Sequence, residues 1–159
     1  MKSRLLVAAI LIALVGCGVK GPPVAPELAR PARIEDLRAV PDPEGIKLAW
    51  QRPTTYAGGG RMRDLGGFVI LRSTGGGPME PLVELPVTDQ ERFSVEHEFE
   101  YIDNETQLGQ RYQYEVLART LDGYVSAPSN EVALTRTKPP PPPNPETFTL
   151  PTPSPLPTS

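Results

Sequence analysis

Two side chains occur only once in this sequence and could do chemistry that the others cannot: Cys17 and His97. A lone cysteine forms no disulfide within its own chain. A zinc site needs three or four ligands, and one histidine does not supply them. A nucleophilic triad needs a base and a partner that orients it, and one histidine does not supply both. His97 lies in the acidic stretch Glu91–Glu100, where we expect a solvated strand edge or loop. We therefore predict no catalytic and no metal site, and Cys17 is the reactive side chain left to explain.

Two further patterns could in principle hold a substrate. Glu96, Glu98 and Glu100 alternate along the chain, so a strand would project them to one side, where carboxylates could hydrolyse a sugar. Three like charges on one face are more typical of a solvated surface. Gly58–Gly60 could cradle a phosphate, but no Gly-Lys-Ser/Thr sequence follows, and we expect a flexible loop over Arg52–Gly66. The sequence thus predicts a non-enzymatic protein without a cofactor.

The residues before Cys17 form a leader. Lys2 and Arg4 carry positive charge, and the eleven residues Leu5–Val15 are apolar throughout. A helix of this length rises only about 16 Å, about half the thickness of a hydrocarbon core, so it is too short to span a bilayer. Its length and flanks are typical of a cleaved secretory signal. The Leu-Val-Gly-Cys sequence at its end resembles the lipobox of bacterial lipoproteins, which predicts a signal peptide over residues 1–16.

The lipobox resemblance implies a covalent lipid on Cys17: a diacylglycerol on the sulfur and an acyl chain such as palmitate on the amino group. Two or three chains hold a protein firmly at a membrane, whereas a single chain holds it only marginally. Gly18, in place of an aspartate, favours the outer membrane by the sorting rule of enterobacterial lipoproteins. We expect a bacterial cell-envelope protein that is anchored through membrane lipid and faces the periplasm.

Proline divides the mature chain into three parts. Residues 17–31 contain four prolines and residues 139–159 contain ten, and proline disfavours both helix interiors and sheet ladders. We expect a lipid anchor with a proline-rich tether over residues 17–31, one domain over residues 32–138 and a disordered proline-rich tail over residues 139–159. Removing the leader leaves 14 basic and 19 acidic residues, a balance that argues against nucleic acid as a partner.

The predicted domain has an apolar period of two. Ile46, Leu48 and Trp50 alternate with Lys47, Ala49 and Gln51, and the pattern returns after residue 111. Such alternation is typical of antiparallel sheets that place one face on a core. Without a convincing amphipathic helix, the sequence predicts an all-β sandwich of seven strands. The expected strands are Ile34–Val40, Ile46–Gln51, Gly67–Arg72, Leu82–Val87, Glu98–Ile102, Tyr112–Arg119 and Glu131–Thr135.

Four of these segments resemble a fibronectin type III domain, which is an immunoglobulin-like sandwich. The matching sequences are IKLAWQRP, GGFVILRS, GQRYQYEVLA and DGYVSAPSNEVALT, within residues 32–137. The resemblance implies that Trp50 fills the core and that the hydroxyl of Tyr112 binds a backbone group a few residues upstream. Tyr114 and Val116 share the alternating face of Tyr112, and we expect them in the core as well.

The segment CGVKGPPVAP, directly after the leader, has a resemblance of its own. It is similar to the start of small lipoproteins that associate with the lipopolysaccharide transport machinery of the outer membrane. This resemblance implies a role in partner binding for Lys20, Gly21 and Pro22, and the alternative is a plain tether. Arg61 and Arg63, in the expected loop, are further candidates for partner contact.

Three functions remain open on the sequence. The first is a protein-interaction or spacer module that contacts another envelope protein of unknown identity. The second is recognition of glycan or peptidoglycan through exposed aromatic side chains such as Tyr56 and Tyr124. The third is an accessory factor of lipopolysaccharide transport or outer-membrane assembly.

Overall fold

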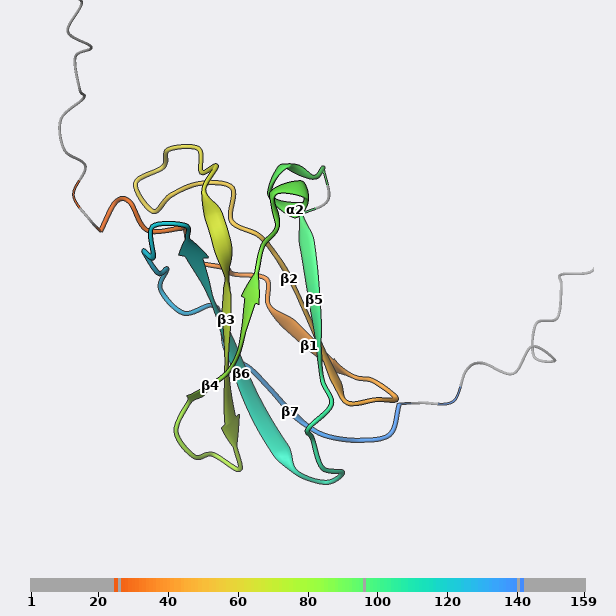
Figure 1. The fold of residues 1–159 in the computed structure, drawn as a ribbon. Coiled ribbons are helices and arrows are strands. Elements are labelled where there is room, and N and C mark those ends of the chain that lie inside the picture. Colours follow the sequence, from red (N-terminus) through yellow and green to blue (C-terminus); the bar gives the residue numbers. More distant parts are fainter. Residues whose placement is uncertain (1–24, 26, 96, 140, 142–159) are drawn as a thin grey trace, which may run out of the picture.

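The computed structural model describes residues 25, 27–95, 97–139 and 141. They form two antiparallel sheets that pack face to face, with one short helix between β4 and β5 (Figure 1). The three-stranded sheet has the order β1 (Arg38–Pro41), β2 (Ile46–Gln51), β5 (Glu98–Asp103). The four-stranded sheet has the order β4 (Glu80–Pro86), β3 (Leu65–Thr74), β6 (Arg111–Thr120), β7 (Val132–Thr135). The prediction of an all-β domain with seven strands is confirmed, apart from the helix.

The alternation in β6 shows why these residues form strands. Tyr112, Tyr114, Val116 and Ala118 are buried, whereas the residues between them are half-buried on the outer face. β3 pairs with β6 along its length, with Ile70 opposite Val116. The sheet therefore presents a continuous apolar face to its partner sheet.

An aromatic cluster fills the space between the sheets. Trp50 on β2 is fully buried, and its ring meets that of Phe68 on β3 edge-on, with centroids 5.3 Å apart. Phe99 on β5 lies 4.8 Å from Phe68 in a tilted arrangement. Such pairs contribute roughly 0.5–1.5 kcal/mol beyond the area they bury. Trp50 thus joins the two sheets at the centre of the core.

The turn before β6 is closed by the hydroxyl of Tyr112. This oxygen accepts a hydrogen bond of 2.9 Å from the backbone N–H of Gln107, five residues upstream. Gly109 supplies the positive φ of 82° that the turn requires. Leu108, beside it, is exposed. The turn therefore depends on glycine at 109.

Most expected strand boundaries differ from the structure by one or two residues, and the start of β1 differs by four. β1 begins at Arg38 and not at Ile34, because the backbone at Leu37 bonds to the side chain of Asn130 instead of a neighbouring strand. The side chains of Ile34 and Leu37 are nevertheless buried in the core. β4 begins at Glu80, two residues before the expected start. These shifts change the strand ends and leave the predicted core intact.

The described chain enters and leaves at opposite ends of the sandwich (Figure 1). Near the start, Pro31 is fully buried and forms an isolated bridge with Tyr56, although the sequence places it in the tether. Near the end, the backbone of Arg136 bonds to that of Gly109, and its guanidinium donates to the Pro43 carbonyl oxygen. We call these the entry end and the exit end. Among the described residues, no helix is long and apolar enough to cross a membrane.

We predict that Trp50→Ala lowers the free energy of unfolding by about 3–5 kcal/mol, because the cavity between the sheets cannot collapse fully. Leu121→Ala, at an exposed position, should change it by less than about 0.5 kcal/mol. Chemical denaturation of both variants measures the difference. Equal stabilities would contradict the central place of Trp50 in the core.

Candidate functional site

A groove opens at the entry end of the sandwich. It has a volume of about 520 Å³ and is lined by residues 52–54, 61–63, 65, 92–95 and 97. Two structures form its walls: the chain between β2 and β3, and the short helix α2 (Asp89–Phe93) with the residues that follow it. We refer to it below as the groove.

The first wall is a small hairpin within the segment that the sequence predicts as a flexible loop. The N–H of Tyr56 donates to the Gly60 carbonyl oxygen at 2.8 Å, and the N–H of Met62 donates to Thr54 at the same distance. Gly59 has a φ of 88°, which a glycine adopts without strain. The three glycines therefore make a tight hydrogen-bonded turn, and the expectation of an unstructured loop is corrected.

The hydroxyl of Tyr56 stabilises this hairpin. It donates a hydrogen bond of 2.6 Å to the carboxylate of Asp64, and this bond, together with burial, raises the pKa of Tyr56 to about 12. The ring is half-buried. Of the two tyrosines expected to stack on sugars, Tyr56 is thus held by the fold, whereas Tyr124 is 41% exposed.

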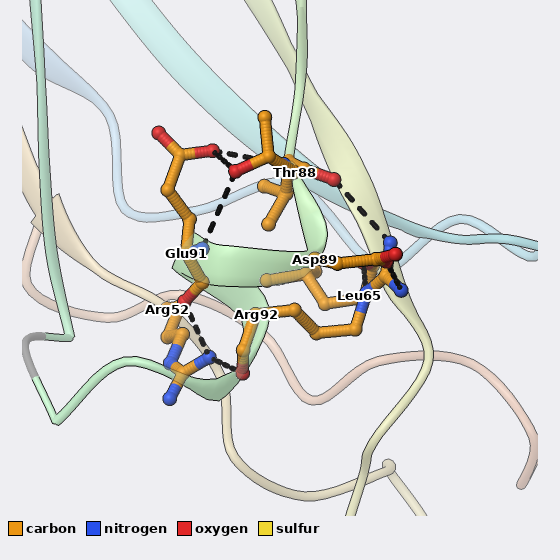
Figure 2. Close-up of polar contacts among 7 residues, drawn as sticks. Arg52, Leu65, Thr88, Asp89, Glu91 and Arg92 are labelled. Carbon is orange, nitrogen blue, oxygen red and sulfur yellow. Dashed lines mark hydrogen bonds and ion pairs between the residues drawn. The ribbon is translucent and has the colours of Figure 1, made fainter.

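The second wall is α2, which the sequence analysis missed. Thr88 caps the helix: its hydroxyl accepts from the N–H of Glu91, and the Glu91 carboxylate accepts from the N–H of Thr88 at 2.8 Å. This reciprocal pair is a capping box, shown in Figure 2. The Thr-x-x-Glu spacing is visible in the sequence and could have revealed the helix.

Arg52 holds the second wall to the first. Its guanidinium donates to the carbonyl oxygens of Glu91, Arg92 and Ser94, and its Nε donates to Nδ1 of His97 at 2.8 Å. Figure 2 shows Arg52 reaching the end of α2. The carbonyl end of a helix attracts a cation, so the charge adds to the hydrogen bonds. His97 is half-buried and its Nδ1 serves as an acceptor, in place of the solvated setting predicted.

Arg92 fastens α2 to the four-stranded sheet. Its Nε donates to the Leu65 carbonyl oxygen at 2.8 Å, and its other nitrogens reach the Val87 carbonyl oxygen and the carboxylate of Asp89 (Figure 2). The side chain is mostly buried. Arg52 and Arg92 are therefore used by the fold itself.

Arg61 and Arg63 differ from these two arginines. Both side chains are exposed, and neither has a hydrogen bond or ion pair with another described residue. Their charges are free to meet an anion from outside. Between them Met62 is buried, which fixes the two arginines on the outer side of the hairpin.

The lining of the groove is cationic and apolar. Within the part of the chain that the structure describes, no carboxylate lines it, and no three His, Cys, Asp or Glu side chains come together as metal ligands. Phe93 and Val95 add exposed apolar surface, at 70% and 91% exposure. The groove therefore offers two unpaired cations beside two protruding apolar side chains.

The alternating glutamates lie on the outer face of the three-stranded sheet. Glu98 pairs with Arg38, and Glu100 pairs with Lys47 at 2.6 Å. Both pairs are solvated, so each contributes little to stability. Glu96 lies outside the described residues.

A buried ionic cluster near the exit end escaped the sequence analysis. Asp103 is 1% exposed and accepts from Arg72 at 2.9 and 3.1 Å and from the hydroxyl of Tyr114 at 2.7 Å. Burial and the hydrogen bond to Asp103 raise the pKa of Tyr114. The three residues belong to β5, β3 and β6, so the cluster joins both sheets. Its partners are far apart in sequence, and no local spacing could reveal it.

The predicted site residues fall into three groups. Cys17, Gly18 and the candidate contacts Lys20, Gly21 and Pro22 lie outside the described residues. The predicted core positions Trp50, Tyr112, Tyr114 and Val116 are buried. Arg61 and Arg63 share the groove with residues that the sequence analysis did not select, namely Arg52, Arg92, Phe93 and Val95.

Comparison with known proteins shows similarity in fold. No family model and no curated protein matches the sequence. The chain is similar to the twitchin kinase region from C. elegans (Fn31-NL-kin-CRD-Ig26), with a TM-score of 0.50 and 15% identity over 69% of this chain and 17% of that one. An Fn3-like protein from Clostridium thermocellum has a TM-score of 0.46 and 22% identity over 68% of this chain and 95% of that one. The likeness to the first structure, whose name includes both an Fn3 and an Ig domain, supports a β-sandwich fold of this general kind for the domain.

We predict that Arg52→Ala lowers the free energy of unfolding by about 1–3 kcal/mol, since several carbonyl oxygens lose a charged donor. Amide hydrogen exchange should accelerate most in α2 and in the residues that follow it. Arg61→Ala is the matched control, because the Arg61 side chain has no hydrogen bond or ion pair with another described residue, and it should leave both measurements unchanged. Unchanged exchange at α2 in the Arg52 variant would contradict its role as a clamp.

Proposed function

We propose that this chain is a lipid-anchored cell-envelope protein whose Fn3-like domain acts as a protein-interaction or spacer module. The anchor is the acylated Cys17, and Gly18 directs the protein to the outer membrane on the periplasmic side. The observation that carries the proposal is the separation of the two ends of the domain. The arm that begins at Cys17 joins the entry end, and the proline-rich tail continues from the exit end.

This arrangement suits a module that separates the segment before the domain from the segment after it. The ten-residue strands β3 and β6 run between the two ends, which places the ends roughly 33 Å apart at about 3.3 Å per residue. The proline-rich tail starts on the side away from the anchor.

The groove favours contact with a charged surface, of a protein or of a membrane, over sugar recognition. Its two arginines with unpaired side chains and its two exposed apolar side chains fit such a surface better than a neutral sugar. Peptidoglycan recognition depends on exposed tyrosines, and Tyr56 is committed to Asp64. A role in lipopolysaccharide transport depends on Lys20, Gly21 and Pro22, outside the described residues.

The anchor is tested by Cys17→Ser expressed beside the unaltered chain in an enterobacterial host. We predict that the unaltered protein is recovered in outer membranes, with a mass that includes the acyl chains and lacks residues 1–16. The Cys17→Ser variant should be an unacylated precursor or a protein released from the membrane. Gly18→Asp is the matched control for sorting, since it keeps the acylated cysteine and should move the protein to the inner membrane.

Crosslinking in the same membranes tests the interaction. The acylated chain should yield a reproducible adduct with an envelope protein, and Cys17→Ser should lose it. A free thiol with the leader still attached would overturn the anchor. An acylated chain without any protein adduct would favour the spacer role.

A further inference from the structure

The apolar surface of the domain is concentrated at the entry end. Eight large apolar side chains are exposed among the described residues, and Val95 and Phe93 are the most exposed of them. Both line the groove, two residues apart. Three further members of the group, Leu28, Leu121 and Tyr124, lie in segments that hydrogen-bond to the hairpin of the groove or follow β6. Protruding apolar groups in a soluble domain mark a contact with another surface.

The contacts of these residues place them at one end. The N–H of Gly58, in the hairpin of the groove, donates to the Leu28 carbonyl oxygen at 3.3 Å. The N–H of Leu121 donates to the Asp64 carbonyl oxygen at 2.8 Å, so the turn after β6 borders the same hairpin. Leu108 is exposed as well, but it lies at the exit end, next to Gly109, whose N–H donates to the Arg136 carbonyl oxygen.

Free positive charge accompanies this apolar surface. The side chains of Arg61 and Arg63 line the groove without a hydrogen bond or ion pair to another described residue, and Arg30 is exposed beside the hairpin. Of the carboxylates around the groove, Asp64 accepts from Tyr56, Asp89 pairs with Arg92 and Glu91 caps α2, whereas Asp122 in the turn after β6 is exposed. The groove itself is lined by four arginines and by no carboxylate, so its lining departs from the acidic average of the chain.

The length of the arm decides which surface lies within reach. Leu28, whose carbonyl oxygen accepts from Gly58, lies eleven positions after Cys17, so the arm spans at most about 40 Å when fully extended. A lipid on Cys17 therefore confines the entry end to the neighbourhood of the bilayer. At such an effective concentration even weak contacts are occupied.

We propose that the entry end docks on an anionic phospholipid bilayer, with Arg61 and Arg63 on headgroup phosphates and with Phe93 and Val95 inserted between headgroups. This inference rests on the proposed lipid anchor. Basic side chains are attracted to anionic leaflets, and aromatic and aliphatic side chains gain by leaving water at the interface. Docking turns the exit end and the tail away from the membrane.

The single cysteine allows docking to be tested without biological acylation. The mature chain is coupled through Cys17 to a maleimide lipid in vesicles that contain phosphatidylglycerol and brominated phosphatidylcholine. Phe93→Trp reports contact with the membrane by fluorescence quenching, because Trp50, the only native tryptophan, is fully buried. Leu108→Trp, at an exposed position of the exit end, is the matched control.

We expect the Phe93→Trp signal to be quenched severalfold more than the Leu108→Trp signal. Substituting both Arg61→Ser and Arg63→Ser, or raising the salt concentration, should reduce this quenching towards the control value. Vesicles of phosphatidylcholine alone should also reduce it. If Phe93→Trp does not fold, Val95→Trp takes its place at the more exposed position.

Equal quenching at both ends, or quenching that is unchanged without the two arginines, would overturn the proposal. Absent quenching together with a protein crosslinked at the groove would assign the surface to an acidic protein partner instead. The quenching experiment attaches the lipid to Cys17 chemically, so its outcome does not depend on acylation in the cell. If the protein isolated from cells carries no acyl groups, the proposed anchor is refuted, but the quenching measurement still reports whether the entry end contacts a bilayer.

Discussion

The backbone pairing between residues 28–32 and residues 55–58 is the constraint on which the functional interpretation depends. Three hydrogen bonds make this pairing: Ala32 to Thr55, Ala57 to Arg30 and Gly58 to Leu28. The pairing fixes the N-terminal arm to the hairpin that forms one wall of the groove. Because hydrogen-bonded backbone cannot swing freely, the arm must leave the domain at the entry end. The groove and the start of the described chain therefore lie side by side.

Two arginine clamps and one buried cluster keep the rest of the domain in place around this pairing. Arg52 and Arg92 hold α2 against the hairpin and the four-stranded sheet, so their charges are not available to a ligand. Near the exit end, Asp103 joins Arg72 and Tyr114 across the two sheets. Breaking a buried pair of this kind leaves an uncompensated charge, so the cluster favours a single alignment of the sheets. The two ends differ in chemistry: a buried ionic cluster lies near the exit end, and an open groove lined by arginines lies at the entry end.

Local patterns in the sequence predicted the strands and the core because the apolar period of two depends only on neighbouring residues. β2 was predicted with its observed bounds, and the alternating residues of β6 are buried as expected. The groove could not be found in this way, since Arg61, Arg92 and Phe93 come together only through the packing of distant segments. α2 was missed although Thr88 and Glu91 carry a capping signal, because five residues show no apolar period. The prediction for Cys17 lies outside the described residues, and neither the fold nor the comparisons test it.

The distance of each end from the bilayer tests the account most directly. Spin labels on Ala57→Cys, at the entry end, and Thr74→Cys, at the end of β3, can be compared in the acylated protein in membranes, where the native thiol is blocked. Electron paramagnetic resonance with water-soluble and lipid-soluble relaxants should place residue 57 at the headgroups and residue 74 roughly 30 Å farther out, the length of one ten-residue strand. Equal depths, or residue 74 nearer to the lipid, would contradict the orientation.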